Sequence, residues 1–179
     1  EERSFPYDNA FHLVIDGALS PDMEVYFSDK MGSVWHISRD GAVDCTYDAA
    51  AHETEDFFSI ASDVGCDGRG NVYFNDVGLR EIRRITPAGD VETVIAKGEP
   101  MTELPEAFNE LPIYSAFSVS SDGLVTVAYS DSYYDAENNE QIYDYNLYLK
   151  AENGTVLMNG SVLEKSGAVK GSGWLGAAA

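Results

Sequence analysis

Four tyrosines and an aspartate gather within thirteen residues in the last third of the chain. They are Tyr133, Tyr134, Asp135, Tyr143 and Tyr145. A tyrosine ring offers a rigid apolar face with a polar tip, so it can stack on a sugar or a peptide and also hydrogen-bond to it. The spacing indicates a binding site for a carbohydrate, another small molecule or a protein. Alternating tyrosines are also ordinary in β-strands, where they need bind nothing.

Trp35 and two arginines are the other candidates for contact with a ligand or partner. Arg80 and Arg83 belong to the single basic cluster of a strongly acidic chain. They would either anchor an anionic partner or pair with acids nearby. Trp35 stands beside His36 in a strand pattern, so one of these side chains points inward and the other outward.

Residue types that hold metals are present without the spacing that a metal site needs. The three histidines stand far apart, which does not suit zinc. Asp29, Asp76 and Asp131 recur at one place in a repeated pattern, and carboxylates are calcium ligands. An aspartate at the end of a strand more often accepts backbone N–H bonds in the next turn. No serine-hydrolase, phosphate-loop or zinc-protease motif occurs. We therefore expect no catalytic residue, no metal ligand and no cofactor, with calcium as the open alternative.

These candidates lie on three copies of one strand pattern. The segments EVYFSD at 24–29 and NVYFND at 71–76 are offset by 47 residues, and a third copy ends as AYSD at Asp131. A short apolar run precedes each copy, at 11–15, 57–62 and 114–120, and Asp16-Gly17 reads as a turn after the first run. Two further short strands follow each copy. Four strands in about 40 residues make one propeller blade.

We predict an all-β chain with one propeller-like domain over residues 1–179. It would contain three four-stranded antiparallel blades, at about 11–49, 57–98 and 114–160. Residues 161–179 would begin a further strand or form a tail. Blade 3 has ten extra residues in the hairpin between its middle strands, where the tyrosines gather.

Residues 67–95 resemble the NHL repeat of β-propellers. The resemblance rests on the motif D-x-x-G-N-V-Y-x-x-D, which is followed by REIRRITPAGDV and a closing strand. The likeness extends more loosely to six-bladed propellers of the gluconolactonase and strictosidine synthase type. It implies that three blades are half of a ring, or a truncated six-bladed propeller. The chain is then a piece of a longer propeller, a half that closes as a homodimer, or a propeller that has lost blades.

The charge balance excludes some partners. With 31 acidic and 11 basic residues the formal net charge is −20, which repels phosphate backbones and anionic membrane surfaces. We expect no nucleic-acid binding and, without an apolar run of about 18 residues, no direct insertion into a membrane. Two cysteines, Cys45 and Cys66, are too few for a disulfide scaffold, although one bridge between blades stays open.

The resemblance and the missing catalytic motifs predict a non-catalytic NHL-like module for protein or ligand recognition. Strong acidity, little lysine and much tyrosine suit a secreted or extracytoplasmic part of a larger protein or assembly. The first alternative is a metal-dependent propeller enzyme of the lactonase or lyase type. It requires acidic and asparagine side chains that converge on the axis of the ring. The second alternative is a self-assembling half-propeller with a structural role.

Overall fold

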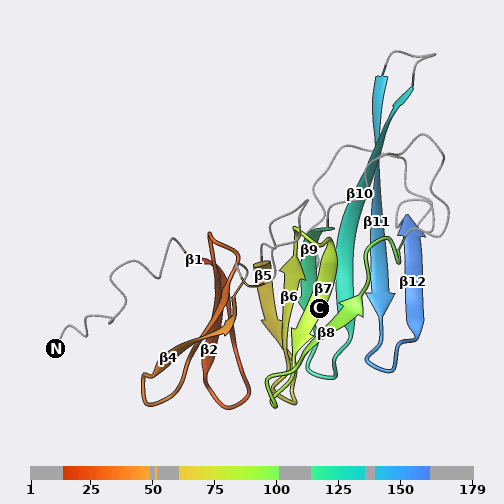
Figure 1. The fold of residues 1–179 in the computed structure, drawn as a ribbon. Helices are drawn as coiled ribbons and strands as arrows, with labels where there is room; N and C mark the ends of the chain where they lie inside the picture. The colour runs from red at the N-terminus through yellow and green to blue at the C-terminus, as the bar shows by residue number, and fades with distance from the viewer. Residues whose placement is uncertain (1–13, 49–50, 52–60, 101–113, 136–139, 162–179) are drawn as a thin grey trace.

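The computed structural model describes residues 14–48, 51, 61–100, 114–135 and 140–161. All twelve elements in these residues are β-strands, and they form three four-stranded antiparallel sheets (Figure 1). The predicted fold class, an all-β chain of three propeller blades, is confirmed. The described residues include no helix that is long and apolar enough to cross a membrane.

Each sheet is built from four strands that follow one another in sequence. Blade 1 consists of β1 (Val14–Leu19), β2 (Val25–Asp29), β3 (Val34–Ile37) and β4 (Val43–Tyr47). Blade 2 consists of β5 (Ala61–Cys66), β6 (Val72–Asp76), β7 (Glu81–Ile85) and β8 (Val91–Ile95). Blade 3 consists of β9 (Tyr114–Val119), β10 (Val125–Asp135), β11 (Glu140–Lys150) and β12 (Val156–Ser161).

The first strand of each blade is the inner one. Blade 2 lies between blades 1 and 3 (Figure 1), and β5 contacts β1 on one side and β9 on the other. Tight turns join the strands within a blade. Gly41, Gly89 and Gly154 occupy the turn between the third and fourth strands with φ of 85°, 88° and 85°, a left-handed conformation that favours glycine. The blades therefore repeat in detail as well as in outline.

The described strands β1 and β5 begin at Val14 and Ala61. The expected runs at 11–15 and 57–62 lie mostly outside the described residues, as does the expected tail after Ser161. In the structure Asp16 and Gly17 form part of β1 and pair with Ser28 and Phe27. The expectation of a turn at these two residues was wrong, because their turn propensity is overridden by pairing with β2.

Two apolar cores hold the blades together. The first joins blades 1 and 2 and the second joins blades 2 and 3. The first contains Val34, Tyr47, Ala61, Val64, Val72, Phe74 and Ile85. The second contains Tyr73, Ile82, Ile95, Val125, Val127, Tyr129 and Tyr148. Each core takes side chains from two blades, so burial of apolar surface stabilises the arrangement of the sheets as well as each sheet.

A buried network of three polar side chains connects blades 1 and 2 across the first core. Tyr47 Oη donates a hydrogen bond to Asp76 Oδ2 at 2.9 Å, and Arg83 Nη1 donates to Tyr47 Oη at 2.9 Å. The Arg83 Nη1 atom also lies 3.7 Å from Asp76 Oδ2. Asp76 has no exposed surface and Tyr47 is 2% exposed. The phenol of blade 1 therefore stabilises a carboxylate that blade 2 buries.

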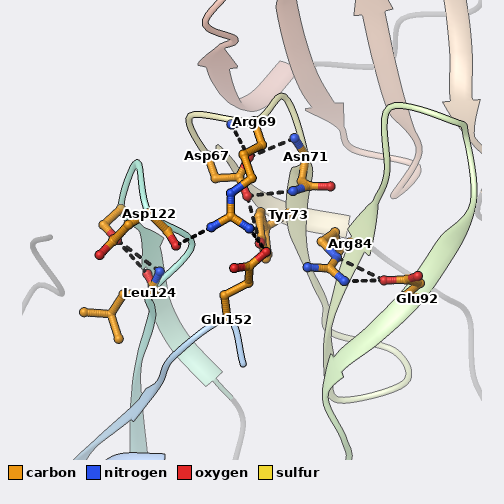
Figure 2. Close-up of polar contacts among 10 residues, drawn as sticks. Asp67, Arg69, Asn71, Tyr73, Arg84, Glu92, Asp122, Leu124 and Glu152 are labelled. Carbon is orange, nitrogen blue, oxygen red and sulfur yellow. Dashed lines mark hydrogen bonds and ion pairs between the residues drawn. The ribbon is translucent and has the colours of Figure 1, made fainter. Parts of the chain in front are cut away.

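A second network of polar side chains connects a turn of blade 2 to turns of blade 3 (Figure 2). Arg69 pairs with Glu152 and donates from Nη2 to the carbonyl oxygen of Asp122 at 3.0 Å. Burial would raise the pKa of Asp67, but hydrogen bonds from Asn71, the Arg69 backbone and Tyr73 outweigh it and lower the pKa. This network orders the turn between β5 and β6 against blade 3.

Of the three recurrent aspartates, Asp29 and Asp76 are at the end of a strand, whereas Asp131 is inside one. Asp29 Oδ1 accepts backbone N–H bonds from Met31 at 2.9 Å and from Ser33 at 3.1 Å, and Asp76 Oδ1 accepts one from Leu79 at 3.0 Å. Both residues end their strands, as the sequence predicted. Asp131 instead continues within β10 and pairs with Asp144, because this hairpin is longer than its counterparts.

Candidate functional site

Two aspartates occupy the same place on neighbouring inner strands. Gly17 pairs with Phe27 and Val64 pairs with Phe74, so the residues just before them, Asp16 and Asp63, are structurally equivalent. In blade 3 the same register puts Ala116 at this place, one residue before Phe117. The acidic positions therefore belong to blades 1 and 2 alone. Asp16, Ser62 and Asp63 are on the inner strands β1 and β5, and Ser28 and Asn75 are on the adjacent strands β2 and β6. We call these five residues the inner-strand cluster.

Hydrogen bonds between the two blades fix this cluster. Asp16 Oδ2 accepts a bond from the backbone N–H of Val64 at 3.0 Å. Ser28 Oγ donates to the carbonyl oxygen of Ser62 at 2.6 Å. Both contacts cross from blade 1 to blade 2 at either side of Asp63. The backbone around Asp63 is thereby held on a rigid pair of strands, as a preorganised site requires.

Within the cluster, Asp63 has a carboxyl group with a shifted pKa. Burial raises its pKa, and the negative charge of Asp16 raises it further. Hydrogen bonds from Asn75 and from Ser62, the latter at 3.3 Å between Oγ and Oδ2, oppose this shift without cancelling it. A half-buried carboxyl with a raised pKa accepts and returns a proton more readily near neutral pH than a free aspartate does.

The described residues do not fit a resident metal. No group of three or more histidine, cysteine, aspartate or glutamate side chains among them could hold a metal ion. Asp16 Oδ2 already accepts a hydrogen bond from the backbone N–H of Val64. We therefore assign no chemical step to a metal, and the calcium alternative stays a prediction.

The tyrosine-rich hairpin lies away from this cluster. Tyr133, Tyr134 and Asp135 are at the end of β10, and Tyr143 and Tyr145 are in β11, opposite Ser132 and Ser130. The hairpin extends well beyond the rest of the three sheets (Figure 1). Sequence and structure agree that it is elongated, and its role in binding stays a prediction.

The three remaining candidates lie in separate places. Trp35 Nε1 donates to Asp29 Oδ2 at 2.9 Å, which attaches the indole to the turn that Asp29 organises. Arg83 belongs to the buried network that it forms with Tyr47 and Asp76, and its side chain is 14% exposed. Arg80 lies in the turn between β6 and β7 with φ of 59°. The structure does not bring these residues together into one site.

The sequence contained a signal for the inner-strand cluster that our reading missed. Asp16 and Asp63 are offset by 47 residues, the same offset that relates the first two VYF strands. Asp16 was interpreted as part of a turn, and Asp63 was not singled out. The repeat alone could have shown that both blades carry an acid at one position of the inner strand.

Several solved structures similar to the chain are described as enzymes. A putative gluconolactonase matches with a TM-score of 0.51 and 18% identity, over 86% of this chain and 50% of that chain. A gluconolactonase from Xanthomonas campestris matches with a TM-score of 0.51 and 16% identity, over 81% of this chain and 46% of that one. Virginiamycin B lyase from Staphylococcus aureus matches with a TM-score of 0.47 and 13% identity, over 83% and 55%.

The chain spans about half the length of these solved structures. No family model matches the sequence, and the comparison with curated proteins finds no match. The similarity establishes a propeller-like fold, and the narrower NHL assignment stays a prediction. The expectation of a non-catalytic module is corrected, because two solved structures that share the fold with a TM-score of 0.51 are described as gluconolactonases, one of them as a putative one. That finding favours the enzyme alternative.

Proposed function

We propose that the chain contributes part of the active site of a propeller enzyme of the lactonase or lyase class. The carrying observation is Asp63, a half-buried carboxyl with a raised pKa, held between Ser62 and Asn75 beside Asp16. Asp16 and Asp63 are on the inner strands β1 and β5, and Asn75 is on the neighbouring strand β6, which supports the enzyme alternative without testing convergence on a ring axis. The fold shared with two gluconolactonases favours a lactone as the substrate class.

Lactone hydrolysis needs one group that moves a proton twice. The Asp63 carboxylate takes a proton from water as the water oxygen forms a bond to the lactone carbonyl carbon. The bond between the carbonyl carbon and the ring oxygen then breaks, and Asp63 returns the proton to the ring oxygen as it leaves. The product is the open hydroxy acid. No electrons enter or leave, so no redox partner is required.

The other members of the cluster position this carboxyl. Asn75 and Ser62 donate hydrogen bonds to Asp63, so its orientation is set before a substrate binds. Asp16 supplies a negative charge close by, which favours the protonated form of Asp63. The bond between Asp16 and the Val64 backbone keeps that charge on the inner strand.

A lactone panel tests the proposal. The chain is incubated with five- and six-membered aldonolactones, and acid release is followed with a pH indicator. We expect turnover by the wild-type chain, and a loss of about 100-fold or more in kcat/KM for Asp63→Asn. Asp90→Asn removes the same charge from an exposed turn residue and should leave kcat/KM unchanged. Absence of turnover across the panel, or an equal rate in Asp63→Asn, would overturn the proposal.

A further inference from the structure

Each blade has two faces, and the chain packs them in one fixed order. Face A of blade 2 carries Val72 and Phe74, and face B carries Tyr73 and Ile82. In the first core, Val34 and Tyr47 on face B of blade 1 pack on face A of blade 2. In the second core, face B of blade 2 packs on face A of blade 3, which carries Val125 and Val127.

Face A of blade 1 has no blade against it in the described structure (Figure 1). Val25, Val72 and Val125 are equivalent, because each pairs with the last residue of its inner strand. Val72 is 2% exposed and Val125 is 1% exposed, but Val25 is 39% exposed. Its partner Leu19 is 53% exposed. The part of face A around Val25 and Leu19 is thus open to solvent, whereas Phe27 on the same face is 6% exposed.

Face B of blade 3 is the matching surface at the other end of the chain. By register Leu147 takes the place of Val34 and Ile82, since these residues pair with Ala128, Ser28 and Asn75 at equivalent positions. Val34 and Ile82 are completely buried between blades, whereas Leu147 is only half-buried. Leu149 stands where blade 1 has His36 and blade 2 has Arg84. Face B of blade 3 therefore has leucines at two positions, beside Thr126 and Ala128, which are 7% and 5% exposed.

We propose that a second copy of this chain covers both open faces. Face B of blade 3 in each copy packs on face A of blade 1 in the other, so a two-fold ring of six blades closes. This contact repeats the B-on-A packing that the chain already uses twice. A closed ring leaves no apolar blade face exposed.

Charge gives the dimer a characteristic salt dependence. Each copy carries a formal charge of −20, so the two copies repel each other at long range. Salt screens this repulsion, with a Debye length of about 30 Å at 0.01 M and about 8 Å at 0.15 M. The residues proposed to make the contact, Val25 and Leu19 on face A and Leu147 and Leu149 on face B, are apolar and uncharged, so added salt removes repulsion without screening an attraction between them. The dimer should be tighter at high salt than at low salt.

Sedimentation equilibrium of the 179-residue chain tests this inference. At micromolar concentration and 0.15 M salt we expect twice the chain mass of 19.5 kDa, with dissociation at low salt. Val25→Glu puts a charge on face A and should give a monomer. The control Val156→Glu has the same chemistry at a residue of blade 3 that is 46% exposed, and should remain dimeric. Circular dichroism checks that each variant is folded.

A mixing experiment tests the order of the faces. Leu149→Glu alters face B and Val25→Glu alters face A, so each variant alone should be monomeric. The mixture retains one unaltered A face and one unaltered B face, on different copies, and should form a weaker heterodimer through that single contact. A monomeric wild-type chain at both salt concentrations, larger open assemblies, or no heterodimer on mixing would each overturn the proposal. None of these readouts depends on enzymatic activity.

Discussion

Replacing Tyr47 by phenylalanine should destabilise the junction of blades 1 and 2 more than a typical tyrosine-to-phenylalanine change. The substitution removes the hydroxyl that donates to Asp76 at 2.9 Å and accepts from Arg83 at 2.9 Å. Asp76 has no exposed surface, so water cannot replace the lost donor. Hydrogen bonds to charged groups contribute about 1.5–3 kcal/mol, and we expect a loss of about 2–3 kcal/mol in the free energy of unfolding.

Urea denaturation followed by fluorescence measures this loss. The matched control is Tyr129→Phe, which removes a 2.9 Å hydrogen bond to the neutral amide of Asn159 from a ring that is 4% exposed. A neutral bond contributes about 1 kcal/mol, so the control should lose less than half as much as Tyr47→Phe. Equal losses in the two variants, or no loss in Tyr47→Phe, would refute the assignment of a stabilising role to the phenol–carboxylate contact.

Three further outcomes follow from the structure. Because the pKa of Asp63 is raised above its ordinary value of 3.8, its ionised form destabilises the folded chain at neutral pH. Asp63→Asn should therefore raise Tm at pH 7, and the gain should fade as pH falls through the raised pKa towards 3.8; a gain that grows with acid would contradict this. In Gly68→Ala the new methyl group would lie 2.7 Å from the Ser121 carbonyl oxygen, and we expect the free energy of unfolding to fall by about 2–3 kcal/mol. Gly89→Ala, which has open space at φ of 88°, should cost about 1 kcal/mol; an equal cost would show that the close approach at Gly68 is unimportant. Cys45 and Cys66 are free thiols, and burial raises the pKa of each to about 11. Alkylation by iodoacetamide at pH 7.5 should be slow and rise about tenfold per pH unit up to pH 10; fast labelling at pH 7.5 would contradict the raised pKa of these thiols.

The blades were predictable because the repeat is local. The VYF strands and the turn glycines recur at a fixed offset, and each pairs with its sequence neighbours. The bridge left open between Cys45 and Cys66 was a question about two blades, and the sequence could not answer it. The structure shows both thiols free.

The inner-strand cluster was less accessible because its properties arise between blades. That Asp63 is half-buried and that Asp16 lies close enough to raise its pKa follow from the packing of β1 on β5. Neither fact is contained in the local pattern of either strand. The turn propensity of Asp16-Gly17 also pointed away from a strand, and only pairing with β2 overrides it.

The dependence of kcat/KM on pH tests the proposed role of Asp63 most directly. With an aldonolactone that the wild-type chain hydrolyses, we expect kcat/KM to rise with pH through the raised pKa of Asp63 and then level off, because the carboxylate is the base. In Asp63→Asn this limb should disappear along with most of the rate, while Asp90→Asn should keep the wild-type curve. The same limb at the same pH in Asp63→Asn would contradict the account, because the proton would then be moved by another group.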